Sequence, residues 1–314
     1  MLKRSRPGID RAIEPQYGVT REGQPLSYNR APAPDLAPWI AWLYVTIVNS
    51  PPNHKLDCGL FNDTAVLRMQ LKGNWAAQTA RGEAAHGRKV LLFGPQTRRM
   101  PISVTGPFTS VGVALRPGAI HALKGPKLSE SLDSIIVMSQ IDHTGTPVFD
   151  RFDPDASPED WVQAMEALMR SWITNVGAKQ PDPLSVRFET LAFTDPTASI
   201  GDFARDSGVD LRRLERLIRR DFGLSPKKVL RRARALDIAS HLRGVADKDE
   251  AEELMLRYYD QSHMIHDFTD LFGMSPGQFV ERPQPLLTLT LESRQACRLG
   301  ALDRLAPGAV RPWE

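Results

Sequence analysis

The sequence predicts an α+β protein in which a mostly-β N-terminal domain precedes an all-α C-terminal domain. Short apolar segments separated by Gly, Pro and Asn turn signals occupy residues 64–116, as in a strand-rich fold. Residues from about 183 to 280 show helical periodicity instead, and they contain one helical frame twice, 50 residues apart. A chain of 314 residues is long enough for two such domains.

The first half divides into a loose lead-in, residues 1–34, and a β-rich domain, residues 35–150. The segment PDLAPWIAWLYVTIV predicts a short capped helix that runs into a buried stretch. The predicted strands are 64–71, 75–80, 89–93 and 109–116, followed by short helical stretches at 117–124 and 127–138.

A well-delimited helix and a linker, residues 151–182, follow this domain. Ser157 is a predicted N-cap, Pro158 fits the first turn, and Gly177 fits the helix end. The apolar stripe between them is typical of ordinary packing.

Composition excludes several classes of protein. Only two cysteines occur, Cys58 and Cys297, with no CxxC spacing, so a reducing cytoplasm is the expected compartment. No apolar run approaches the length of a membrane span, and no secretory signal follows the basic start. The net charge of +3 is too small to indicate a nucleic-acid partner without a local concentration of charge.

The repeated frame pairs DFGLSP at 221–226 with LFGMSP at 271–276. Upstream, the same offset pairs Asp210 with Asp260 as helix caps, and then two apolar positions four residues apart. Gly then permits the left-handed turn that ends each helix, and Ser-Pro caps and opens the next one. In the first copy a shorter helix and Gly208 come before this helix, which together predict a helix-turn-helix.

The helix predicted at 210–222 separates apolar from basic residues. Its inward arc holds Leu211, Leu214, Leu217, Ile218 and Phe222, and Glu215 lies at the edge of the outward arc. The outward arc is made of five arginines: Arg212, Arg213, Arg216, Arg219 and Arg220. Surface helices usually mix charge signs, whereas arginine alone suits guanine edges or phosphates in a major groove. A merely solvated basic face is the alternative.

The helix predicted at 260–272 places Met264 and Phe268 inward. Its outward residues are Gln261, Ser262, Ile265 and His266, which could contact base edges and thymine methyl groups. Residues 200–243 carry twelve Lys/Arg against six Asp/Glu, whereas residues 244–280 carry two against eight. The first unit is therefore expected to hold a polyanion more strongly than the second.

Residues 183–281 resemble the DNA-binding domain of AraC/XylS-type transcription regulators, on the motifs LxRLIRRDFGLSP and YYDQSHMIHDFTDLFGMSPGQF. The resemblance implies two helix-turn-helix units joined by a long helix, SPKKVLRRARALDIASHLR at 225–243, with recognition helices in successive major grooves. It implies base-facing roles for Arg212, Glu215 and Arg216, and then for Gln261, Ser262, Ile265 and His266.

The N-terminal part is similar to a β-rich domain, barrel- or cupin-like, found ahead of this module in some AraC-type proteins. The supporting segments are PDLAPWIAWLYV, VLLFGPQTR and VGVALRPGAIHAL. The resemblance implies operator DNA and RNA polymerase as partners, and favours an activator. It also implies that the N-terminal domain binds a small effector or mediates homodimerisation.

Two residues depart from the family pattern: Arg257 where the second turn normally has Gly, and Glu253 where the preceding helix has a small Ala. A left-handed backbone is costly for arginine, so weaker DNA contact by the second unit is expected. The tail at 282–314 lies beyond the resemblance and has no assignment.

Enzymatic and metal chemistry find little support. His54, Asp57 and Cys58 are close in sequence, but a turn with a buried cysteine is the stronger interpretation. His263 and His266 lack a third ligand, and His86, His121 and His143 follow no metal motif, so no metal and no cofactor are expected. The rival hypothesis is an effector-binding or catalytic N-terminal domain whose degenerate helix-turn-helix module makes protein contacts.

Overall fold

The computed structural model describes residues 6–138, 147–247, 261–304 and 309–314. Eight strands form one antiparallel sheet in the order β1-β2-β7-β4-β6-β8, with β3 paired to β7 and β5 to β4. The strands are β1 (Tyr28–Arg30), β2 (Ile40–Val48), β3 (Lys55–Leu60), β4 (Val66–Thr79), β5 (Gly82–His86), β6 (Val90–Phe93), β7 (Met100–Leu115) and β8 (Ile135–Val137).

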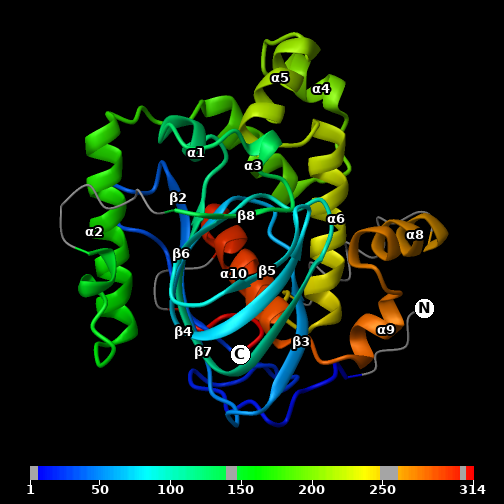
Figure 1. The fold of residues 1–314 in the computed structure, drawn as a ribbon. Coiled ribbons are helices and arrows are strands. Elements are labelled where there is room, and N and C mark those ends of the chain that lie inside the picture. The colour runs from blue at the N-terminus through cyan, green and yellow to red at the C-terminus, as the bar shows by residue number, and fades with distance from the viewer. Residues whose placement is uncertain (1–5, 139–146, 248–260, 305–308) are drawn as a thin grey trace.

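Both faces of the sheet are covered by helices. Helix α2 (Pro158–Val176) lies against one face, and α10 (Pro285–Ala301) crosses the other (Figure 1). Successive strand residues point to opposite faces, so Leu43 shares a core with α2 while Tyr44 belongs to the core that contains α10.

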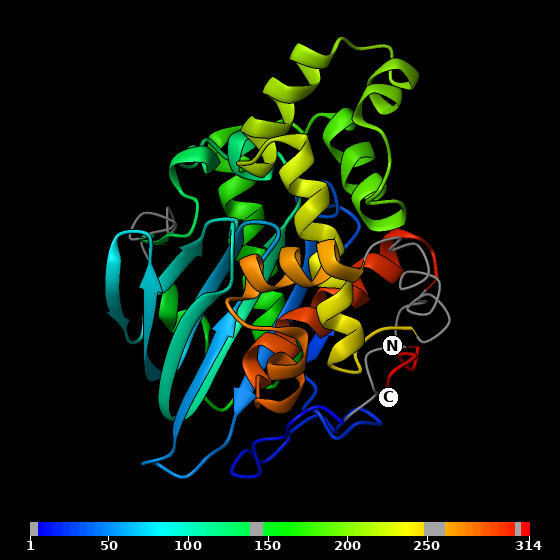
Figure 2. The ribbon, with the colours of Figure 1, turned by 90° about the vertical axis from the view of Figure 1, so that its right-hand side faces the viewer.

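Helix α6 (Pro226–Leu242) joins the remaining helices (Figure 2). Helices α3, α4 and α5 gather at its N-terminal end, while α8 and α9 lie along its side. The bounds are α1 (Ala119–Ala122), η1 (Leu128–Glu130), η2 (Val148–Arg151), α3 (Pro183–Thr194), α4 (Ile200–Asp206), α5 (Leu211–Phe222), α8 (Gln261–Phe272) and α9 (Pro276–Glu281). The predicted α+β class, β-rich first and helical second, is confirmed.

The predicted helix at the start of the β-rich domain is wrong. Residues 35–39 form turns, and 40–48 form the buried strand β2. Because this strand is covered on both faces, its sequence is a continuous apolar run without the alternation that identifies a half-buried strand.

Other strand boundaries also differ from the prediction. Residues 64–71 and 75–80 belong largely to one strand, β4, whose register shifts near Gly73 (φ 99°), so the glycine marks a bulge and not a hairpin turn. The stretch 127–138 is not helical beyond the single turn η1, since β8 adds an edge strand there. Strands β3 and β5 were not predicted.

The unassigned tail contains a helix that belongs to the core. Thirteen of the seventeen residues of α10 are buried, among them Leu287, Leu291 and Glu292. Because α10 contacts both the sheet and α6, it contributes to a core shared by the two halves of the chain. Among the helices within the described ranges, none has the combination of length and apolar character that a membrane span requires.

Candidate nucleic-acid interface

The first helix-turn-helix consists of α4, a turn at Gly208 and α5. Gly208 has a φ of 66°, a left-handed value that glycine adopts without strain. The Asp210 carboxylate accepts a hydrogen bond from the backbone N–H of Arg213 at 2.8 Å, which caps α5. Gly223 (φ 75°) ends the helix. These residues therefore fix both ends of α5 locally, as the sequence predicts.

Helix α5 has one buried and one exposed face. Leu214, Leu217, Ile218 and Phe222 are buried, as expected from the apolar arc. Leu211 does not join them: 52% of its surface is exposed. It lies in the first turn, whereas the opposite end of α5 packs on the segment around Leu128 and Leu132. The assignment of Leu211 to the inward face is therefore wrong.

The arginine row of α5 faces solvent. Arg212, Arg213, Arg216 and Arg219 are exposed, and within the described ranges their side chains form no hydrogen bond or ion pair. Glu215 is exposed among them. The four guanidinium groups are thus available to an external anion.

Arg220 differs from its neighbours. Its Nε donates to Asp221 at 2.6 Å, and Asp221 is fully buried and accepts a second hydrogen bond from Ser185 in α3. Hydrogen bonding to this carboxylate raises the pKa of Arg220. The contact fixes Arg220 against the domain, although the side chain keeps 40% of its surface exposed.

The second unit repeats the frame of the first. Met264, Phe268 and Phe272 are buried like Leu214, Ile218 and Phe222, and Gly273 (φ 70°) ends α8 as Gly223 ends α5. The following serines differ, however. Ser275 forms a capping box with Gln278, whereas Ser225 makes no side-chain cap because Lys228 occupies the equivalent position.

The predicted contact residues of α8 are only partly described. His266 is exposed and Ile265 has 41% of its surface exposed, so both are accessible. The side chains of Gln261 and Ser262 lie outside the described residues, as do Asp260, Glu253 and Arg257.

Ion pairs within the protein reduce the charge contrast between the two units. Arg231 of α6 donates to Asp267 at 2.8 Å and to Asp270 at 2.7 Å, which neutralises two acids of α8. Arg232 and Arg243 are buried and donate to backbone carbonyls of other segments. Burial lowers the pKa of both guanidinium groups to about 10. The net charge of each unit therefore overstates what a polyanion would meet, and the exposed row on α5 remains the main cationic feature.

The enzyme and metal candidates are arranged for other roles. Cys58 is buried in β3, and burial raises the pKa of its thiol. His54 bonds Asp10 at 2.9 Å, not Cys58. Within the described ranges no group of three or more His, Cys, Asp and Glu side chains could hold a metal ion, and His143 is not described.

Sequence comparison identifies two regions. A family described as "Helix-turn-helix domain" matches residues 203–282, and one described as "Domain of unknown function (DUF6597)" matches residues 28–136. No curated protein sequence matched the chain.

Three solved structures illustrate the similarity of fold. ToxT from Vibrio cholerae with a bound unsaturated fatty acid is 9% identical, with a TM-score of 0.45 over 76% of this chain and 94% of that one. The AraC-like transcriptional activator CuxR is 15% identical, with a TM-score of 0.30 over 71% and 84%. A cupin superfamily protein from Desulfitobacterium hafniense is 12% identical, with a TM-score of 0.21 over 29% and 75%.

The C-terminal region is therefore a helix-turn-helix domain, the kind of domain by which transcription regulators bind DNA. More specifically it is of the AraC type, and in this chain it follows a β-rich N-terminal domain.

Proposed function

We propose that this protein is a sequence-specific regulator of transcription that inserts α5 into the major groove of double-stranded DNA. The observation that carries the proposal is the exposed row of unpaired arginines on a helix capped at both ends. A planar guanidinium can bond O6 and N7 of guanine together, and a rigid helix holds several of them in register with base edges.

The residues of α5 divide into two roles. Arg212, Glu215 and Arg216, near the N-terminal end, are assigned to base edges, because that end of a recognition helix enters the groove. Leu211 joins them as an exposed apolar side chain that suits a thymine methyl group. Arg213, Arg219 and Arg220 are assigned to phosphates, and Arg220 is the least adaptable of them because Asp221 holds it.

The second unit is assigned a supporting role. Helix α8 presents Ile265 and His266, and the predicted set also includes Gln261 and Ser262. Arg231 fixes α8 to α6 through Asp267 and Asp270, so the two recognition helices keep a defined relative position. This rigidity supports binding to successive major grooves.

The remaining partners follow from this role. A regulator of this kind acts in the cytoplasm on an operator, and activation would require contact with RNA polymerase. The β-rich domain, with α10 against its sheet, is the proposed place for a small effector or for homodimerisation.

Selection from a randomised duplex library tests the function. We expect the full chain to enrich a defined motif, with an affinity that falls as salt rises because phosphate contacts release counterions. Enrichment of no motif would contradict DNA reading and favour a module that serves protein contacts.

A further inference from the structure

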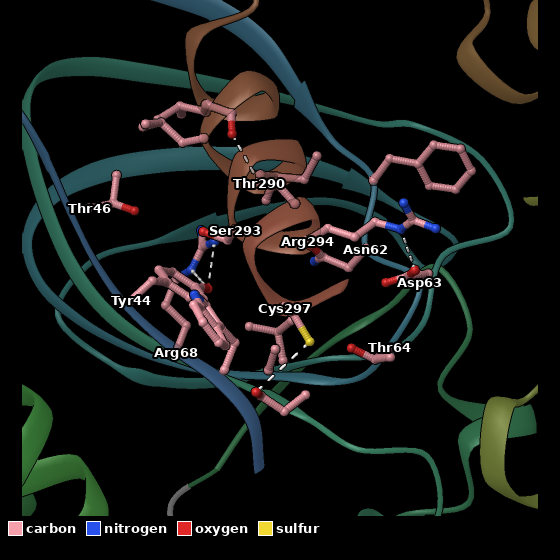
Figure 3. Close-up of a pocket in the computed structure, with 18 of the residues that line it drawn as sticks. Tyr44, Thr46, Asn62, Asp63, Thr64, Arg68, Thr290, Ser293, Arg294 and Cys297 are labelled. Carbon is pink, nitrogen blue, oxygen red and sulfur yellow. Dashed lines mark hydrogen bonds and ion pairs between the residues drawn. The ribbon is translucent and has the colours of Figure 1, made fainter. Parts of the chain in front are cut away.

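A cavity of about 60 Å³ lies between the sheet and α10 (Figure 3). Strand β2 supplies Trp42 and Tyr44, β4 supplies Arg68, and α10 supplies Ser293 and Arg294. For comparison, a cavity of roughly 150 Å³ holds benzene, so a ligand of this cavity has only a few heavy atoms.

The cavity has a paired end and an unpaired one. In Figure 3, Asn62, Asp63 and Arg294 lie on one side, and Tyr44 with Arg68 on the other. At the first end, Arg294 bonds both Asp63 (2.7 Å) and Asp237, and Asp63 also accepts from Arg232 through its backbone carbonyl. Two cations thus face two anions there.

Glu189, the other acid that lines the cavity, is neutralised as well. Arg116 donates to it at 2.7 Å. Arg68 is consequently the remaining charge at the cavity. Only 6% of its surface is exposed, and within the described ranges no carboxylate lies within ion-pair distance of its guanidinium.

The surroundings of Arg68 hold it in place without neutralising it. Its Nη2 and Nε donate to the Tyr44 hydroxyl at 3.1 and 3.3 Å, and its Cζ lies 4.8 Å from the centre of the Phe93 ring. Gly112 makes room for Tyr44, because a Cβ there would lie 2.0 Å from the tyrosine ring. Burying an unpaired cation is costly, which indicates that a partner of opposite charge belongs beside it.

Two further donors support an anion. Asn62 Nδ2 and Arg294 Nη2 are buried at the lining of the cavity without a hydrogen-bond partner among the described residues. Trp42 and Phe108 add apolar surface to the same space. A carboxylate matches the planar guanidinium, and a short hydrocarbon part matches the rings.

We propose that this cavity binds a small monocarboxylate through Arg68. Such a ligand touches the sheet and α10 at once, next to the Arg294–Asp237 contact with α6. Only its regulatory consequence rests on the proposed function, since binding itself requires no DNA.

Thermal unfolding of the full chain with sodium propionate tests this. Binding to the native state alone raises Tm as ligand concentration rises, so we expect a saturable increase with propionate. Sodium chloride at equal ionic strength, propionamide and inorganic phosphate should give none. We expect Arg68→Gln to weaken propionate binding about tenfold or more, and Arg98→Gln, an exposed arginine outside the cavity, to bind like the wild type.

Calorimetric titration of the wild type with propionate provides a readout that does not depend on variant folding. A second variant, Ala114→Leu, fills the cavity from β7 and should also prevent binding. No saturable response of the wild type beyond chloride would overturn the proposal, as would equal binding by Arg68→Gln. A protein that selects a DNA motif but ignores propionate would overturn this inference alone.

Discussion

Arg216 lies one helical turn after Arg212 on α5, exposed and without an ion pair to any described residue. An arginine in this state can form a bidentate contact with guanine without first giving up a partner. Arg220, bound to a buried carboxylate, would have to exchange one anion for another. Exposure alone therefore does not rank these side chains, and their existing contacts do.

Replacement of Arg216 should change specificity as well as affinity. We expect Arg216→Ala to cost about 1–3 kcal/mol on the best DNA site and to relax one base position. His266→Ala should cost less, because α8 carries little free positive charge. Gel shifts on the selected site and its single-base variants measure both, with Arg81→Ala in the β4–β5 turn as a control. A uniform loss on all sequences would make Arg216 a phosphate contact, and equal losses for the two variants would contradict the ranking.

The two cysteines should be inert in the folded protein. Burial raises the pKa of Cys297 to about 12 and also raises that of Cys58, so neither forms a thiolate near neutral pH. Mass spectrometry after iodoacetamide treatment should find an unmodified native chain and two additions after denaturation. Rapid labelling of native Cys58 would revive the thiol-nucleophile hypothesis.

At the scale of elements, α5 was predictable because its signals are local. Asp210, the apolar spacing and Gly223 all lie within fourteen residues and act on the helix itself. Strand β2 was not predictable in the same way. Its apolar run is compatible with a helix or a strand, and only the layers on either side of the sheet decide between them.

The cap of α5 can be tested against a matched position. Asp210→Ala should lower the free energy of unfolding by about 1 kcal/mol, because a helix N–H loses its acceptor. Ser225→Ala should change it less, since Ser225 forms no side-chain cap on α6. Denaturant unfolding of both variants measures the difference, and equal losses would show that the Asp210 hydrogen bond is not stabilising.

For the whole molecule, α10 is the element that the sequence identified least. Its leucines surround the helix instead of forming one stripe, because it is buried by the sheet on one side and by α6 on another. The buried contacts of Arg243 and Arg294 were equally hidden, since their partners are distant in sequence. The exposed arginine row needed no such knowledge, which is why it could be predicted.

The shared core predicts that α10 stabilises the whole chain. Leu287 is fully buried, so Leu287→Ala should lower the free energy of unfolding by about 2–5 kcal/mol. Leu211→Ala, which removes an exposed leucine, should change it by about 0.5 kcal/mol or less. Thermal or denaturant unfolding compares them, and a small effect of Leu287→Ala would show that α10 is only loosely attached.

The most direct test of DNA reading is a thermodynamic cycle between Arg216 and the guanine that it contacts. The guanine at the position relaxed by Arg216→Ala is replaced by 7-deazaguanine, which lacks the N7 acceptor, and Kd is measured for all four combinations. If Arg216 bonds N7, the wild type should lose affinity on the modified site, while Arg216→Ala should bind both sites alike. Equal losses for the two proteins would contradict the placement of Arg216 in the major groove.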